Sequence, residues 1–313
     1  SARATASTRA GDAEVLLSAA AMTSDGDARY PWPAELSDGV PATVFGGDRE
    51  RAQHLDVVER VGPWSFRASY NHRRKYMPTG AYGTQPRAGT FNDDHRAYAE
   101  LRFDKTLGEL GLAARAAYDA SWYHGHFITL DPTEGTEEVL RARWVTGELR
   151  LTLPAFWRQR LTLGGELVRQ LEMFTDEPFP GYPPVPRDLI LSAYLVDDIR
   201  VSSRLQVNLG LRSDSYVHTS GTTVSPRVAV VGRPYQGGNT KLFFGRSFRA
   251  PSPNELASHV EPSLRPETIW SAEIEHSHRV TDDIHLIGAL FASWLDHLLS
   301  LYSDADLGDL YRN

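Results

Sequence analysis

Apolar and polar residues alternate along most of the chain with a period of two. In the segment 97–104 the odd-numbered positions, from Ala97 to Phe103, are apolar, and the even-numbered positions are mainly charged. Such alternation predicts a strand with one face against an apolar environment and one face against water. We find about thirteen such segments, which include 110–123, 148–153, 160–167, 204–214 and 283–294.

The segments are long, and the connections between them alternate in length. Several segments are much longer than the usual strand of about 5 to 6 residues. Their lengths are close to the roughly 9 to 11 residues with which a tilted strand crosses a bilayer. Short connections are expected at 61–63, 105–109, 154–159, 201–204, 234–238 and 280–283, and long ones at 23–50, 74–92, 125–140, 175–188 and 249–266. Unequal rims of this kind are typical of outer-membrane barrels.

The pattern therefore predicts an all-β fold, a large antiparallel transmembrane β-barrel. A soluble β-sandwich or propeller would also show the alternation, because any half-buried antiparallel sheet does. Strand length and connection rhythm favour the membrane barrel. No apolar run is long enough for a transmembrane helix.

Composition narrows the function. The formal net charge of −7 and the pI near 5.9 argue against a protein that mainly binds nucleic acid. Cysteine chemistry is excluded because the chain has no cysteine. The first residues contain neither an apolar signal segment nor an initiator methionine. We expect a disordered or cut segment at 1–10 and barrel strands over 11–313.

Three stretches occur in an order that indicates a family. They are LFFGRSFRAPSPNEL, LRPETIWSAEIEH and LIGALFASWLDHLLSL. Together they resemble the barrel domain of TonB-dependent outer-membrane receptors, in which a strand ends in an aromatic-Arg-Ala-Pro motif and the next begins with Leu-x-Pro-Glu. The residues of this chain that carry the motif are Phe248, Arg249, Ala250, Pro251, Pro266 and Glu267.

The resemblance extends over nearly the whole chain and implies a function. Receptors of this kind import scarce nutrients, such as ferric siderophores or cobalamin, across the outer membrane of Gram-negative bacteria. The TonB complex supplies the energy through a plug domain inside a barrel of about 22 strands. About thirteen strands would make a partial barrel, and the plug is expected to be absent from this chain. The implied partners are the TonB complex, the small-molecule ligand and outer-membrane lipid, with no nucleic acid and no cofactor.

The motif also has a physical reading. Pro251 and Pro253 remove backbone donors and end strand pairing, and Ser252 and Asn254 can hydrogen-bond the local backbone in a turn. We expect an architectural role, because rim arginines such as Arg246 and Arg249 mostly meet loop carboxylates or water. Contact of Arg246 or Arg249 with the ligand or the plug stays open as the alternative.

Basic and aromatic residues gather near the expected long connections. Such residues bind anionic or aromatic chelates by cation–π and stacking contacts. The candidate ligand-binding residues are Arg73, Arg74, Tyr76, Tyr82, Trp122, Tyr123, His124, His126 and Arg249. An aromatic girdle at the membrane interface is the alternative, and it is favoured for Tyr118, Trp122 and Trp294.

Two histidine pairs, His124 with His126 and His276 with His278, are spaced two apart, so each pair would share a strand face. Such a pair could chelate a metal, but the sequence identifies no third ligand, and we expect ordinary rim histidines and no metal site. No catalytic motif is present, so we do not expect an enzyme. A passive porin-like or adhesin barrel and a soluble β-sheet binding module remain as alternative functions.

Overall fold

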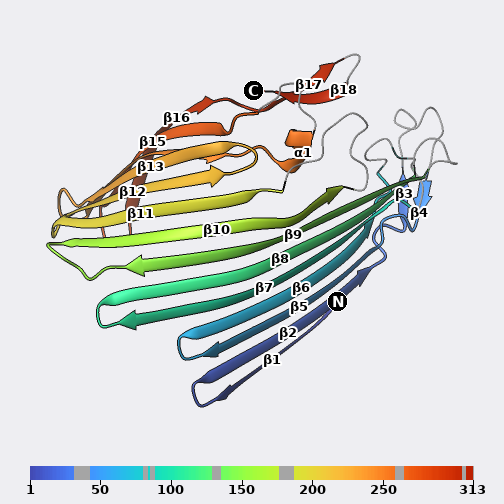
Figure 1. Ribbon diagram of the computed structural model, residues 1–313, viewed down its shortest axis with the longest axis horizontal. Helices are drawn as coiled ribbons and strands as arrows, with labels where there is room; N and C mark the ends of the chain where they lie inside the picture. Colours follow the sequence, from blue (N-terminus) through green and yellow to red (C-terminus); the bar gives the residue numbers. More distant parts are fainter. Residues whose placement is uncertain are drawn as a thin grey trace. The chain divides into compact units, whose positions relative to one another are not determined.

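The computed structural model describes residues 1–31, 43–79, 84, 89–128, 135–175, 187–257, 264–304 and 308–312. These residues form one antiparallel sheet of 14 strands and two two-stranded sheets, β3–β4 and β17–β18 (Figure 1). In the large sheet each strand pairs with the next one along the chain, except that β2 pairs with β5. The prediction of a large antiparallel all-β fold is confirmed. No helix in the described residues is long and apolar enough to span a membrane.

The strands of the large sheet are mostly long. They are β1 (Ala2–Ala10), β2 (Ala13–Ser24), β5 (Glu50–Val61), β6 (Trp64–Tyr76), β7 (Phe91–Leu107), β8 (Leu110–Ile128), β9 (Gly135–Thr152), β10 (Gln159–Thr175), β11 (Leu189–Ser202), β12 (Leu205–Tyr216), β13 (Gly221–Gly232), β14 (Gly238–Arg249), β15 (Glu267–Arg279) and β16 (His285–Asp296). The smaller elements are β3 (Arg29–Pro31), β4 (Thr43–Phe45), α1 (Pro253–Ala257), β17 (Ser300–Asp304) and β18 (Gly308–Arg312).

The chain divides into two compact units. The first comprises Ser1–Phe103, Ala116–Val145 and Gln170–Pro180, and the second comprises Asp104–Arg115, Thr146–Arg169 and Gly181–Asn313. The first unit contains β1, β2, β5 and β6 and most of β7. The second contains β11 to β16.

In the first unit the strand registers sort side chains onto an apolar and a polar face. Trp64 lies opposite Phe103, Ala68 opposite Ala99, and all four side chains share one face. The other face is polar, as in the ion pair between Arg67 and Asp56. This division follows directly from the period-two alternation.

In the second unit the same division holds. Leu195 lies opposite Leu211, and Leu211 is in turn opposite Pro226. Large apolar side chains of both units remain exposed, for example Leu101 at 45% and Leu211 at 50%. Apolar faces this exposed suit contact with hydrocarbon rather than with water.

The expected short connections are confirmed. Gly62 and Gly108 adopt φ angles of 53° and 65° in their turns, a conformation that glycine reaches without steric cost. The connection between β8 and β9 is shorter than the predicted 125–140, because β8 continues to Ile128 and β9 begins at Gly135. The connection between β12 and β13, at 217–220, is also short.

The start of the chain differs from the expectation. Residues 1–10 were expected to be disordered or cut, but Ala2–Ala10 forms β1 and pairs with β2 over its full length. Alanine occupies positions 2, 4, 6 and 10 and polar residues occupy positions 3, 5, 7 and 9, so the segment does alternate, but its apolar positions carry only small side chains. β1 is the strand that raises the count from about thirteen to 14.

Candidate functional site

The polar face of the first unit carries a charged group where β5 and β6 reach the long connections. We call Arg73, Lys75, Asp48 and Glu50 the polar rim cluster. Arg73 Nε donates to Glu50 Oε1 at 2.7 Å, and Lys75 Nζ donates to the Asp48 carbonyl at 3.0 Å and to the Asp48 carboxylate. The Arg73 side chain stays 53% exposed, so its guanidinium remains accessible to a solute.

Asp48 lies in the connection before β5 and is held ionised. The hydrogen bond from Lys75, together with the backbone N–H of Asp27, keeps the pKa of Asp48 below its usual range despite some desolvation. The cluster therefore pairs two cations with two carboxylates at neutral pH.

Neighbouring strands extend this polar surface. Tyr123 donates its hydroxyl hydrogen to Asn92 Oδ1 at 2.9 Å, and Arg96 pairs with Asp119 at 3.4 Å. The polar face therefore presents a tyrosine from β8 as well as the cations of β6.

The predicted ligand-binding residues are divided between the two faces. Arg73 and Tyr123 belong to the polar face, whereas five others belong to the apolar face because neighbours in a strand alternate. These five are Arg74, Tyr76, Trp122, His124 and His126. Tyr82 lies outside the described residues.

The residues on the apolar face make their own contacts. The Arg74 guanidinium lies 4.8 Å from the Phe91 ring centroid, and that of Arg49 lies 4.6 Å from the Tyr76 ring centroid. His124 and His126 both contact the Glu137 carboxylate, with 2.6 Å between His126 Nδ1 and Glu137 Oε1. Glu137 is a neighbour that the sequence did not identify, because it lies on another strand.

Arg249 occupies the junction of the family motif in the second unit. Its two terminal nitrogens donate to the Glu255 carboxylate at 2.9 Å each, and its Nε donates to Glu267. Glu267 also accepts from the backbone N–H of Leu299 at 2.7 Å. Arg249 therefore joins the carboxylate of Glu255 in α1 to that of Glu267 at the start of β15.

A capping box forms the start of α1. The Ser252 N–H donates to Glu255 Oε2 at 2.6 Å, and the Glu255 N–H donates to Ser252 Oγ at 3.3 Å. Burial of the Glu255 carboxyl opposes its ionisation, but Arg249 and Ser252 outweigh burial and keep the pKa of Glu255 below its usual range. The strand end is thus fixed to the following turn by charge and by backbone capping.

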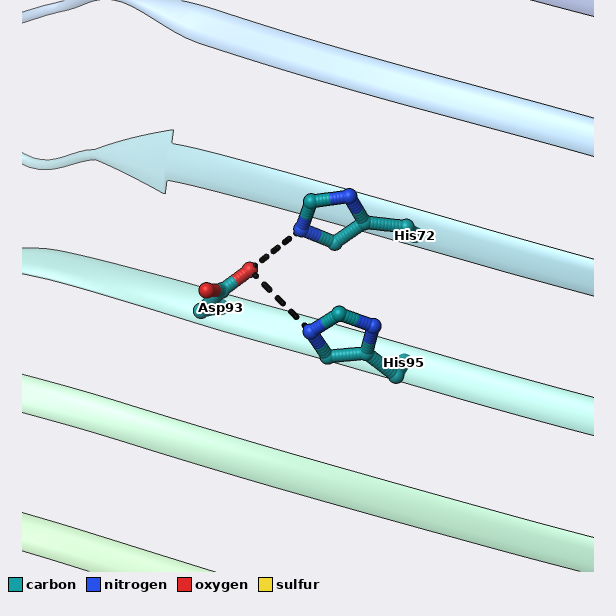
Figure 2. A group of neighbouring side chains, drawn as sticks. All are labelled: His72, Asp93 and His95. Carbon is teal, nitrogen blue, oxygen red and sulfur yellow. Dashed lines mark hydrogen bonds and ion pairs between the residues drawn. The ribbon is translucent and has the colours of Figure 1, made fainter.

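A second cluster of titratable side chains lies on the apolar face of the first unit. His72, Asp93 and His95 bring three potential metal-ligand atoms within 4.8 Å of one another (Figure 2). Sequence reasoning missed this cluster. Its signal is the pairing of His72 with His95 across β6 and β7, which appears only when the register is known.

The remaining histidine pair behaves differently. His276 lies between two hydroxyl groups, 2.8 Å from Tyr235 Oη and 2.8 Å from Thr240 Oγ1. His278 packs its ring against Tyr235. Among the described residues no third metal-binding side chain joins this pair.

Comparison with known proteins settles the family. The family model for the TonB dependent receptor-like β-barrel matches residues 25–313. The chain belongs to this family of TonB-dependent receptors. The family is one of outer-membrane receptors and transporters rather than of enzymes. No curated protein matches the sequence.

Solved TonB-dependent receptors share the fold. A mutant of the ferric enterobactin receptor PfeA from Pseudomonas aeruginosa superposes with a TM-score of 0.75 at 15% identity, over 97% of this chain and 53% of that one. The siderophore receptor PirA from the same organism gives 0.71 at 16%, covering 99% and 56%. PirA from Acinetobacter baumannii gives 0.67 at 14%, covering 99% and 54%. The chain spans about half the length of these receptors.

Proposed function

We propose that this chain contributes barrel strands to an outer-membrane receptor that takes up a ferric siderophore with energy from the TonB complex. The observation that carries the proposal is the family match over 25–313. A siderophore is proposed as the ligand because the similar solved structures are described as ferric enterobactin and siderophore receptors. The proposed partners are the siderophore, outer-membrane lipid and, through a plug domain, the TonB complex.

The polar rim cluster supports an anionic ligand. Arg73 offers an accessible guanidinium, and Lys75 lies two residues further along the same face. Cations at this point favour an anionic chelate over an uncharged nutrient, and Tyr123 adds an aromatic surface. Because Glu50 and Asp48 hold the two cations in the absence of ligand, the ligand must compete with these carboxylates.

The two faces then take different roles. We assign Arg73 and Tyr123 to the ligand, because they lie on the polar face. We assign Trp122 to the aromatic girdle, because its side chain lies on the apolar face with Tyr118. Arg249 is assigned to the architecture of the motif.

The experiment compares Arg73→Ala with Arg67→Ala in the receptor expressed from the complete gene. Both arginines lie on the polar face of β6 and pair with a carboxylate, but Arg67 lies six positions further from the long connection. Binding of radiolabelled ferric enterobactin to whole cells is expected to weaken about tenfold for Arg73→Ala, the low end of the range for a charge-assisted hydrogen bond because Arg73 is half exposed. It should stay unchanged for Arg67→Ala.

Equal affinity of the wild type and both variants would remove the assigned role of Arg73. No binding of any ferric siderophore by the wild-type receptor would contradict the proposed ligand class itself. Surface abundance of each variant is measured in parallel, so that a folding defect is not read as a loss of binding.

A further inference from the structure

We propose that His72, Asp93 and His95 form a binding site for one divalent transition-metal ion of the Zn²⁺ class, which would link β6 to β7 on the apolar face of the first unit. The site lies on the opposite face from the polar rim cluster. The proposal does not depend on the proposed function.

Strand pairing places the three side chains. His72 lies directly opposite His95, and Asp93 lies opposite Arg74, one ladder step of the same face nearer the long connection. The ladder is continuous over Trp64 to Tyr76 and has no register shift. The positions of these residues are therefore set by regular sheet geometry rather than by a loop, as a precise metal site requires.

The potential ligand atoms converge on one point (Figure 2). Asp93 Oδ1 lies 2.6 Å from His72 Nε2 and 3.6 Å from His95 Nε2. The two imidazole rings stack with centroids 4.2 Å apart and planes 6° apart, and the Nε2 atoms of both rings face Asp93. A metal with bonds of about 2.0–2.1 Å in tetrahedral geometry needs its ligand atoms about 3.4 Å apart. Small side-chain rotations would give that separation.

Surrounding contacts orient two of the three ligands. Tyr70 Oη lies 2.8 Å from His95 Nδ1. When His95 Nδ1 donates to this hydroxyl, Nε2 is unprotonated and free to bind a metal, the arrangement seen around metal-binding histidines generally. Arg74 holds Asp93 Oδ2 with both Nε and a terminal nitrogen, so the other carboxylate oxygen, Oδ1, is the one that faces the two histidines.

The chemistry of the set selects the metal class. Two imidazoles and one carboxylate suit Zn²⁺ and similar late first-row ions better than Ca²⁺ or Mg²⁺, which prefer oxygen ligands. The histidine side chains are 24% and 32% exposed. They lie at the connection end of the ladder beside Arg74, where the apolar face becomes charged, so an ion and water can reach them. The cation of Arg74 opposes metal binding and limits the affinity.

The simpler reading is a hydrogen-bonded network of His72, Asp93 and Arg74 that never binds metal. The two readings differ in one measurable property, which is stoichiometric metal binding that depends on both histidines. A network without metal would also leave the stability of the β6–β7 pair insensitive to Zn²⁺.

The experiment uses the receptor from the complete gene, purified in detergent and stripped of metal with a chelator. Zn²⁺ is titrated calorimetrically at neutral pH, and Co²⁺ is titrated as a spectroscopic probe. We expect one high-affinity ion per receptor, and at least about tenfold weaker binding in His72→Gln, His95→Gln and Asp93→Asn. The heat-induced unfolding temperature of the wild type should rise with Zn²⁺, because a ligand that binds only the folded state stabilises it.

Two matched controls each remove one neighbouring histidine. His54 lies on the polar face of β5 and bonds to Asn71, and His124 contacts Glu137 on the apolar face. His54→Gln and His124→Gln should bind Zn²⁺ as the wild type does. Absence of stoichiometric binding to wild type, or binding that survives in His72→Gln and His95→Gln, would overturn the proposal. The absence of stoichiometric binding is measured on the wild type alone, so a misfolded variant cannot leave the question undecided.

Discussion

At the scale of single residues, Arg249 shows how the family motif works. The guanidinium joins Glu255 in the turn to Glu267 at the start of the next strand. Pro251 ends pairing in β14, and Ser252 caps the short helix that follows. The strand therefore stops where the sequence pattern said it would, and charge fixes the direction in which the chain continues.

Glu255 gives this junction a pH dependence. Its pKa is held below the usual value of 4.5 in the folded protein. A depressed carboxyl pKa contributes stability that is present above about pH 4.5, and this stability is lost as the pH falls through the lower folded value. We expect backbone amides of 252–257 to exchange hydrogen faster below that pH, after correction for intrinsic exchange rates.

Glu255→Gln should abolish this dependence and weaken the junction at neutral pH. The expected cost is about 1 kcal/mol, at the low end for charge-assisted hydrogen bonds because Arg249 is half exposed. Hydrogen exchange read by mass spectrometry would then be about fivefold faster in this segment. Asp282→Asn, at a 97% exposed carboxylate, is the control and should change nothing. Equal exchange in Glu255→Gln and wild type would contradict the role given to Arg249.

At the scale of strands, the alternation of apolar and polar residues predicted most of the strands and the face on which each side chain lies. The faces of β7 follow from the sequence, because Ala97 to Phe103 occupy every second position. The same rule also separates two of the candidate ligand-binding residues. Arg73 and Arg74 are consecutive, so on a strand their side chains lie on opposite faces and cannot both contact one ligand. The long connection is expected to begin at Arg74, but β6 continues to Tyr76.

The His72, Asp93 and His95 cluster was beyond sequence reasoning for a different reason. Its members come from two strands joined by the connection 77–90, and a connection of that length does not fix a register. A shift of one residue would move His95 to the other face. The pairing of His72 with His95 therefore comes from the structure and could not be predicted from the sequence.

The assignment of the two faces can be tested by placing one cation on each. An arginine on the lipid-facing side near the membrane midplane costs about 2–4 kcal/mol, whereas the polar side tolerates it. Leu101→Arg introduces the cation on the apolar face of β7, and Ser69→Arg introduces it on the polar face of β6. We expect Leu101→Arg to lower the amount of heat-modifiable folded receptor in the outer membrane and Ser69→Arg to leave it near wild type.

The reverse order would show that the faces are wrongly assigned. Indifference to both substitutions, with folded protein recovered in plain buffer, would favour the soluble β-sheet module instead. Detergent-free solubility and membrane content are therefore measured on the same samples.

At the scale of the whole molecule, membership of the family indicates the function to which the strands contribute. The chain matches the TonB-dependent barrel model over 25–313 and covers 53% of the length of the PfeA receptor structure. A polar face with fixed ion pairs can bind an anionic chelate without an energy source. In the proposed function, passage of the chelate past a plug domain is a separate step that would need work from the inner membrane.

Binding and import should therefore separate when the proton gradient is removed. In cells that express the complete gene, a protonophore is expected to stop accumulation of radiolabelled ferric siderophore and to leave surface binding at its untreated level. If energy reaches the receptor only through TonB, as proposed, a strain lacking TonB should show the same separation without the protonophore. Continued accumulation under both treatments would indicate a passive porin-like barrel, since diffusion through an open polar channel needs no gradient. Arg67→Ala, which leaves the polar rim cluster intact, should match the wild type in every arm.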